Sequence, residues 1–290
     1  MTSFSQGENA RAVFSAVITA AGSSSRMRRS PTDADLGMFK KEYRVLPSSQ
    51  GGRKDESGKP FTVLGAAAAA FASDARITSI VITVPTGPEN GEYAARRALP
   101  ANPAGGGPRV FFVPGGGTRR ESVHHALSLL AASGGAASTG TSRRPPGYVL
   151  IHDGSRPWIS VSLVRAVMEA ALIYGAVIPA LPLTETPKEA EPFAESCGEG
   201  FGNGVYRPGF PAAGFIKRHL RRSSVLTAQT PQCFSFPEIL AAHEKAAEKE
   251  RGGFEYTDDA EIWDEFCGPV AVIAGDPANR KITFPEDLGL

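Results

Sequence analysis

Small and basic residues gather in two stretches near the start of the chain, where they could bind a polyphosphate. Residues 19–27 read Thr-Ala-Ala-Gly-Ser-Ser-Ser-Arg-Met, and a Lys-Lys-Glu-Tyr stretch begins at Lys40. Small side chains let backbone N–H groups approach phosphate oxygens, and runs of such groups bind anions. Arginine presents a planar fork to two oxygens, whereas lysine contributes a point charge. The pattern predicts a triphosphate site, although a flexible turn with solvated charges explains it as well.

Two further stretches place polar residues directly after predicted strands. Residues 113–123 read Val-Pro-Gly-Gly-Gly-Thr-Arg-Arg-Glu-Ser-Val, where glycines precede a helix and Ser122 could bond to a pyrimidine edge. Residues 151–157 read Ile-His-Asp-Gly-Ser-Arg-Pro, where Asp153 ends a buried strand and is a natural Mg²⁺ ligand. Structural alternatives remain open, namely a plain turn before a capped helix, and Asp153 capping a turn while pairing with Arg156.

The apolar runs alternate between strand-like and helix-like periods along most of the chain. Strands are predicted at 13–20, 77–84, 109–113, 148–152, 175–180, 269–274 and 281–284. Helices are predicted at 60–73 (opened by Pro60), 89–99, 118–132, 160–173, 235–250 and 257–266. This alternation predicts an α/β fold, a Rossmann-like three-layer structure with a mostly parallel sheet. Such sheets bind ligands in the loops after their strands, which is where the polar stretches fall.

The chain is expected to form one domain over 13–290 after an N-terminal tail at 1–12. Residues of about 181–226 are rich in proline, glycine and charge, with strand-like pieces such as Gly214–Lys217, so we expect an inserted β-arm there. Residues 47–59 and 133–147 are low in complexity and typical of mobile surface insertions.

Composition narrows the class of protein and its partners. Hydrophobic residues are 41% and charged residues 21% of the 290, and the net charge of +1 indicates neither a nucleic-acid nor a membrane-surface partner. No stretch reaches the ~18 apolar residues of a membrane span, and residues 1–11 lack the features of a signal peptide. Three widely spaced cysteines, Cys197, Cys233 and Cys267, argue against a disulfide framework or zinc site and for a cytoplasmic location.

Together these stretches resemble the signatures of sugar-phosphate nucleotidyltransferases, and most closely those of the 2-C-methyl-D-erythritol 4-phosphate cytidylyltransferase family of the non-mevalonate isoprenoid pathway. The resemblance extends from about Phe14 to Leu288 and includes 183–188, 221–232, 256–260 and 275–287. The dinucleotide fingerprint G-x-G-x-x-G and the P-loop G-x-x-x-x-G-K-[ST] are absent from the sequence.

The resemblance implies an enzyme that transfers CMP from CTP to 2-C-methyl-D-erythritol 4-phosphate, releasing pyrophosphate, with Mg²⁺ on Asp153. It implies catalytic roles for Arg26, Lys41, Lys281 and Arg222. It implies nucleotide binding by Ala20, Ala21, Gly22, Gly115, Gly116, Arg119, Ser122, Gly154 and Arg156. It also implies acceptor binding by Thr186, Arg222 and Thr257, and a homodimer formed through the arm.

A few positions leave alternatives open. Gly117 stands where relatives often carry an acidic residue, which removes any base or ribose contact from that side chain. Lys40 and Arg221 are the alternatives to Lys41 and Arg222. We expect His152 to be structural, and Thr257 is also of a type that caps helices.

Three other functions are compatible with parts of the pattern. A cytidylyltransferase acting on ribitol 5-phosphate or another polyol phosphate would share the fold and most motifs. A nucleotide-binding protein that has lost catalysis would agree with Gly117. A scaffold with a Rossmann-like core would require several separate motifs to coincide by chance.

Overall fold

A computed structural model of the chain describes residues 12–22, 40–50, 52–86, 91–100, 107–135, 146–192 and 214–288. Arg26 and Cys197, both named in the sequence analysis, lie outside the described residues. The chain divides into two compact units, Met1–Pro179 with Gln229–Leu290 and Ala180–Ala228. The second unit contains the range 181–226 for which an inserted arm is predicted.

An eight-stranded sheet has the order β10-β5-β9-β4-β1-β2-β3, with β8 paired to β5. The central strand β1 pairs in parallel with both β2 and β4, and β2 pairs in parallel with β3. Strand β9 runs antiparallel to its neighbours β4 and β5, and β8 runs antiparallel to β5. The predicted α/β architecture with a mostly parallel sheet is confirmed. The strands are β1 Phe14–Thr19, β2 Ile77–Val84, β3 Arg109–Pro114, β4 Tyr148–Asp153, β5 Ala176–Pro182, β8 Leu226–Ala228, β9 Gln232–Ser235 and β10 Ala271–Ala274.

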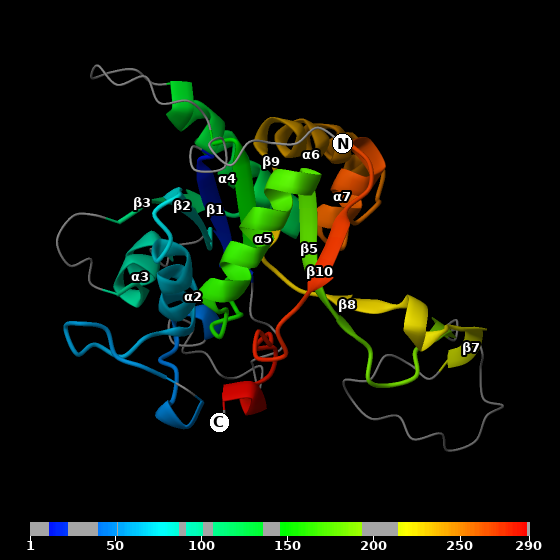
Figure 1. Cartoon of the computed structure of the whole chain (residues 1–290), viewed down its shortest axis with the longest axis horizontal. Helices are drawn as coiled ribbons and strands as arrows, with labels where there is room; N and C mark the ends of the chain where they lie inside the picture. The colour runs from blue at the N-terminus through cyan, green and yellow to red at the C-terminus, as the bar shows by residue number, and fades with distance from the viewer. Residues whose placement is uncertain are drawn as a thin grey trace. The chain divides into compact units, whose positions relative to one another are not determined.

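Side chains that alternate along β1 enter two different cores, one on each face of the sheet. The arrangement of the helices and strands is shown in Figure 1. Ala16 and Ile18 pack with Leu64 of α2, in a cluster that also includes residues of α5. Val17, between them, packs with Leu127 of α4 in a cluster that reaches α6. The two-residue period of a strand therefore places helices on both faces of the sheet. The helices are α2 Val63–Ala72, α3 Gly91–Ala98, α4 Arg119–Gly135, α5 Val161–Tyr174, α6 Phe236–Arg251 and α7 Asp259–Phe266.

Several boundaries differ from prediction for local reasons. Helix α2 does not begin at Pro60, which forms an isolated bridge with Lys54, but after Thr62, whose hydroxyl accepts a hydrogen bond from Gly65 N. Helix α4 continues to Gly135, so the first residues of the predicted 133–147 insertion are helical, and residues 136–145 lie outside the described ones. The strand predicted at 281–284 is wrong, because Thr283 N and Phe284 N donate to the Asp287 carboxylate instead of to a neighbouring strand.

The Ala180–Ala228 unit contains a two-stranded antiparallel sheet of β6 (Lys188–Pro192) and β7 (Gly214–His219). Strand β7 includes the predicted Gly214–Lys217 piece. Strand β6 reads Lys-Glu-Ala-Glu-Pro, and it escaped prediction because this charged sequence has little of the apolar alternation that marks a half-buried strand.

The predicted insertion at 47–59 is organised by hydrogen bonds where it is described. The Asp55 carboxylate accepts bonds from the backbone N–H groups of Ser57 and Lys59. The Lys59 ammonium in turn donates to the carbonyl oxygens of Arg97 and Leu99, at the end of α3. The composition of 47–59 suggested a mobile loop, whereas the hydrogen bonds hold its second half against a neighbouring helix.

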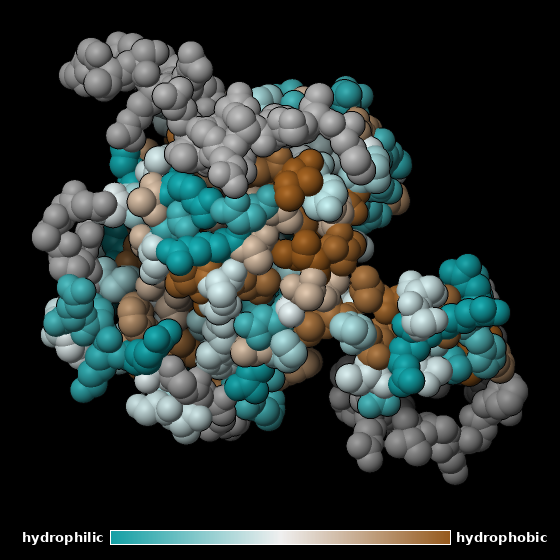
Figure 2. Space-filling view, in the orientation of Figure 1, coloured by the Kyte–Doolittle hydropathy of each residue, from teal (hydrophilic) through white to brown (hydrophobic). Residues whose placement is uncertain are grey.

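Two surface features complete the description. Apolar residues lie near the edge strand β10 on the face shown in Figure 2, where Val272 is 51% exposed. Among the described residues, none of the helices combines the length and the apolar character that crossing a membrane requires.

Replacement of Thr62 by alanine should lower the free energy of unfolding by about 1 kcal/mol, because the cap of α2 is lost. The Thr62 hydroxyl also donates to the carbonyl oxygen of Ala98, at 2.6 Å, so it joins α2 to α3. Urea unfolding followed by circular dichroism measures the change. Thr62→Ser keeps the hydroxyl and serves as the control, and equal stability of Thr62→Ala and wild type would contradict this role.

Candidate active site

The carboxyl ends of three neighbouring strands lie level with one another. Thr19 of β1 pairs with Thr83 of β2 and with Asp153 of β4. Hydrogen bonds continue this alignment into the loops, from Ala20 N to the Thr83 hydroxyl at 3.1 Å and from Gly154 N to Thr19 O at 3.0 Å. The stretches identified after β1 and β4 therefore lie side by side at one edge of the sheet.

The glycine loop after β3 joins the same edge through close backbone contacts. Gly115 N donates to Val84 O, and a Cβ atom on Gly115 would lie 2.2 Å from the Cβ of Ala21. A Cβ atom on Gly154 would lie 2.9 Å from Thr19 O. Both positions need glycine because another chain segment occupies the space of a side chain.

Two side chains at the start of α4 hold the glycine loop. The Ser122 hydroxyl accepts from Gly116 N at 3.0 Å and donates to Thr118 O at 2.9 Å. The Glu121 carboxylate accepts from Gly117 N at 2.6 Å. Gly117 lacks the acidic side chain expected from the resemblance, but a carboxylate from the following helix turn binds its backbone.

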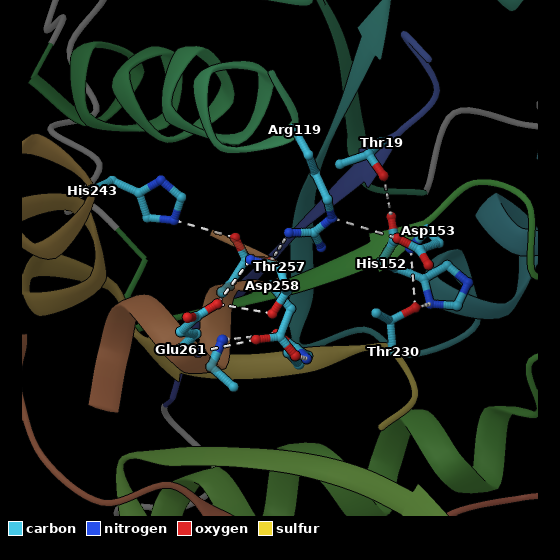
Figure 3. A network of polar contacts seen from close by, with 12 residues as sticks. Thr19, Arg119, His152, Asp153, Thr230, His243, Thr257, Asp258 and Glu261 are labelled. Atoms are coloured by element: carbon cyan, nitrogen blue, oxygen red, sulfur yellow. Dashed lines mark hydrogen bonds and ion pairs between the residues drawn. The ribbon is translucent and has the colours of Figure 1, made fainter. Parts of the chain in front are cut away.

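Three cationic side chains surround Asp153. Figure 3 shows one of them, Arg119, beside the Asp153 carboxylate. Its carboxylate lies 2.9 Å from Lys281 Nζ, 3.5 Å from Arg156 Nε and 3.8 Å from Arg119 Nε. Burial alone would raise the pKa of Asp153, but the charges of Lys281, Arg119 and Arg156 outweigh burial and hold that pKa well below its usual range. Asp153 is therefore an anion, and the surrounding cations exceed its charge.

The two lysines of the Lys-Lys-Glu-Tyr stretch have different partners. The buried Lys41 donates to the carbonyl oxygen of Ile282 at 2.8 Å, directly beside Lys281 in the sequence. Lys40 donates to the carbonyl oxygen of Gly22 in the first loop. Burial lowers the pKa of Lys40 to about 8. The structure thus places Lys41 beside the segment that carries Lys281, and Lys40 beside the first loop.

The Gln-Thr-Pro-Gln stretch at 229–232 contributes supporting residues that the sequence analysis did not single out. Gln229 Nε2 donates to the carbonyl oxygens of Asp276 and Asn279, and Asn279 Nδ2 donates to Thr230 O. Arg156 Nη1 also donates to Asn279 O, at 2.8 Å. These bonds hold the segment of Lys281 against the sheet. Their signal in the sequence was two amide side chains, Gln229 and Asn279, within stretches that carry the resemblance.

His152 connects the same stretch to Asp153, and its ring is fully buried. Its Nε2 lies 3.2 Å from Arg156 O, which can only accept, so Nε2 carries the proton and Nδ1 accepts from the Thr230 hydroxyl at 3.1 Å. The Thr230 oxygen accepts from Asp153 N at 3.0 Å. Burial lowers the pKa of His152 to about 4, so its ring is neutral near pH 7 and fixes the end of β4.

The start of α7 is capped differently from the alternative considered for Thr257. Asp258, not Thr257, is the N-cap, and its carboxylate accepts from Glu261 N at 3.0 Å. Thr257 is exposed, and its hydroxyl donates to the Glu261 carboxylate at 2.8 Å. Gln232 anchors the turn by donating to Asp258 Oδ2 at 2.7 Å. Asp258 directly precedes the first helical residue, Asp259, and aspartate is favoured over threonine at the N-cap.

Thr186 and Arg222 belong to the Ala180–Ala228 unit, and Asp153 belongs to the other unit. Both are exposed, and Arg222 Nη1 donates to the carbonyl oxygen of Thr184 at 2.8 Å. Arg222 is thereby held close to the stretch that contains Thr186, whereas no side-chain contact of this kind is described for Arg221.

Asp153 is the one residue of the predicted site that suits a divalent cation by its chemistry. No group of three or more His, Cys, Asp or Glu side chains suited to a metal occurs in the parts of the chain that the structure describes. Mg²⁺ commonly takes only one or two carboxylates and completes its shell with phosphate oxygens and water. An ionised carboxylate at a strand end, with lysine and arginine side chains around it, has the chemistry to bind such an ion.

Comparison with known proteins identifies a family model and relatives that match parts of the chain. A family model described as IspD, 2-C-methyl-D-erythritol 4-phosphate cytidylyltransferase, matches residues 56–196 and 210–290. The enzyme of that name from Geobacillus kaustophilus is 38% identical over 140 residues, which are 48% of this chain and 51% of that protein. The bifunctional enzyme IspD/IspF of Nitrobacter hamburgensis is 37% identical over 143 residues, 49% of this chain and 30% of that protein. The chain thus spans about half, or less, of the length of these curated relatives.

Solved structures share the fold along nearly the whole chain. The 2-C-methyl-D-erythritol 4-phosphate cytidylyltransferase of Thermus thermophilus has a TM-score of 0.57 at 26% identity and covers 95% of each chain. The 4-diphosphocytidyl-2C-methyl-D-erythritol synthase of Anaerococcus prevotii has a TM-score of 0.64 at 23% identity, covering 98% of this chain and 96% of that one.

The lowered pKa of Asp153 predicts how stability depends on pH. Because the folded-state pKa lies below the unfolded value of about 3.9, Asp153 stabilises the folded state above about pH 4, and acid removes this contribution. The free energy of unfolding of wild type should therefore fall relative to that of Asp153→Asn as the pH falls from about 5 to about 3. Urea unfolding at a series of pH values measures it, and a difference that is independent of pH would contradict the ion cluster.

Proposed function

The chain belongs to the 2-C-methyl-D-erythritol 4-phosphate cytidylyltransferase family, and we propose that it transfers a cytidylyl group from CTP to 2-C-methyl-D-erythritol 4-phosphate. The products are 4-diphosphocytidyl-2-C-methyl-D-erythritol and pyrophosphate. The observation that carries the proposal is the cluster of Lys281, Arg156 and Arg119 around Asp153, beside glycine loops at the edge of a parallel sheet.

The reaction needs position and positive charge more than a nucleophilic side chain. The acceptor phosphate is itself an anion and attacks the α-phosphorus of CTP in line, so one P–O bond forms while the bond to pyrophosphate breaks. Lys281 and Lys41 stabilise the negative charge that accumulates on the phosphate oxygens and the leaving pyrophosphate. Arg26 would add a third cation from the first loop.

Binding of the nucleotide explains why Lys281 rests on Asp153 with its side chain 39% exposed. A triphosphate offers this ammonium a second set of anionic oxygens without moving it from the edge of the sheet. Mg²⁺ held by Asp153 would neutralise part of the triphosphate charge. Arg156 and Arg119 would remain as neighbouring cations on either side.

The nucleotide itself is proposed to lie against the loops after β1, β3 and β4. Backbone groups of Ala20, Ala21, Gly22 and Gly154 would face the phosphates and ribose. The backbone of Gly115 and Gly116 would lie against the flat base beside Ser122. The observed bonds of Ser122 to Gly116 and Thr118 support a role in shaping this loop.

Thr186 and Arg222 are proposed to bind the acceptor phosphate at the site of a second subunit, in a homodimer formed through the Ala180–Ala228 unit. Thr257 is proposed to bind the acceptor from the unit that carries Asp153. Phe215 and Ile216 of β7 are 62% and 54% exposed, which supports a partner for the Ala180–Ala228 unit. The described cysteines, the buried Cys233 and the exposed Cys267, are both free thiols, in keeping with a cytoplasmic enzyme.

Pyrophosphate release in the presence of CTP and Mg²⁺ tests this function, with 2-C-methyl-D-erythritol 4-phosphate and ribitol 5-phosphate as parallel acceptors. Release with the first acceptor alone is expected. Release only with ribitol 5-phosphate would reassign the acceptor. Tight CTP binding with no release in either case would indicate a protein that has lost catalysis.

Lys281→Ala should lower kcat by about 10²–10³-fold, because it removes a cation that acts on the developing charge. Loss of an exposed lysine elsewhere, as in Lys245→Ala on α6, is the matched control. The measurement is steady-state pyrophosphate release at saturating CTP. A kcat in Lys281→Ala equal to that of the control would exclude the role given to this residue.

Gly115→Ala should weaken CTP binding and lower stability by about 1–3 kcal/mol, because its Cβ atom would force the β3 loop away from Ala21. Gly117→Ala is the control, since its Cβ atom meets only Glu121 Oε2, at 3.4 Å. Calorimetric titration with CTP and urea unfolding measure both effects. Equal CTP affinity in the two variants would show that the loop contact is dispensable.

A further inference from the structure

Arg119 contacts two carboxylates, and the shorter contact is to the one behind the site. Its Nη1 lies 2.7 Å from Asp259 Oδ2, whereas its Nε lies 3.8 Å from Asp153 Oδ1. The Asp259 side chain is fully buried, while that of Arg119 is 28% exposed. Arg119 thus reaches the edge of the site from a buried anchor (Figure 3).

The other oxygen of that anchor faces a second buried side chain. His243 of α6 is fully buried, and its Nε2 lies 3.3 Å from Asp259 Oδ1. Each oxygen of the Asp259 carboxylate therefore has a partner from a different helix, Arg119 from α4 and His243 from α6.

The helix that carries His243 is fixed to α4 by the residue next to Arg119. Arg120 forms an ion pair with Glu250 of α6, and its Nη1 donates to the carbonyl oxygen of His243 at 3.3 Å. The neighbouring residues Arg119 and Arg120 at the start of α4 therefore make different contacts. Arg120 joins two helices, and Arg119 points towards the site.

A buried carboxylate is costly unless charges and hydrogen bonds compensate it. Burial would raise the pKa of Asp259, yet Arg119 and His243 lower that pKa instead. Apolar residues would fill this layer with less cost to stability, so the placement of charge needs another explanation. The geometry offers an explanation, because the Asp259 carboxylate fixes the orientation of the Arg119 guanidinium, directly after the glycine loop.

We propose that Asp259 and His243 are positioning residues, which hold the Arg119 guanidinium at the nucleotide site when a triphosphate and its cation occupy Asp153. This inference rests on the proposed cytidylyl transfer. Asp153 must exchange its partners when substrates bind, whereas the buried Asp259 keeps Arg119. Donors of Arg119 that do not face Asp259 then remain aimed at the nucleotide.

The test compares His243→Leu, which removes the ring nitrogen that faces Asp259 Oδ1 at 3.3 Å, with His243→Gln, which keeps an N–H group on that side chain. In His243→Leu and in Asp259→Asn, KM for CTP should rise by about tenfold or more, equivalent to one weakened charged contact. His243→Gln should restore most of that loss. Glu250→Gln, which disturbs the same helix layer without touching Asp259, should lower stability and leave KM for CTP unchanged.

A direct readout is the Arg119 Nε–H signal in nitrogen-15 NMR of the full chain without nucleotide, assigned with Arg119→Lys. We expect an ordered, slowly exchanging signal in wild type and His243→Gln, and a mobile one in Asp259→Asn and His243→Leu. An ordered signal and an unchanged KM in Asp259→Asn would overturn the proposal. If His243→Leu does not fold, Asp259→Asn decides alone.

Failure of the proposed function gives a different result. A wild type that neither binds CTP nor releases pyrophosphate refutes the cytidylyl transfer, and the NMR comparison still decides whether Asp259 and His243 order Arg119. Equal loss of stability in His243→Leu and His243→Gln, with the Arg119 signal ordered in both, would show that His243 only fills space and would overturn the proposal.

Discussion

The site depends on the in-register parallel pairing of β1 with β2 and β4. Because of that pairing, Thr19, Thr83 and Asp153 lie at the same level of the sheet. Hydrogen bonds from Ala20 N and Gly154 N extend the alignment into the loops. A shift of one residue in a strand would exchange the faces of its side chains and bury the wrong set. Because both faces of β1 are packed, the two cores fix the register and therefore the level of the loops.

A second constraint is electrostatic and follows from the first. Because the strand ends are aligned, Asp153 lies beside the loops. Hydrogen bonds from the side-chain amides of Gln229 and Asn279 hold the segment of Lys281 there. Three cations surround one carboxylate, so the net positive charge at this edge favours the binding of a further anion. The Asp259 carboxylate is more buried than that of Asp153, and of the three cations only Arg119 forms an ion pair with it. One carboxylate is thus placed to exchange partners, and the other is placed to keep its own.

The sequence predicted the sheet and the loops well because apolar runs of period two and their glycine-rich ends are local signals. It could not predict β6, whose charged residues carry no such period, nor the loop at 281–284, where the Asp287 carboxylate binds Thr283 N and Phe284 N. It also missed His243 and Asp259, because their contact joins α6 and α7 through packing that no spacing reveals. Roles carried over from the resemblance, such as that of Arg26, stay predictions.

The inserted unit leaves and rejoins the core at neighbouring points. Gln229 N donates to Pro179 O at 2.8 Å, so the residues that flank Ala180–Ala228 are already joined by a backbone bond. For a loop whose ends are fixed in this way, doubling the length costs only about 0.6 kcal/mol in closure entropy. The core can therefore accommodate large changes in the size of this insertion, which leaves its length free to vary while the strands on either side keep their pairing.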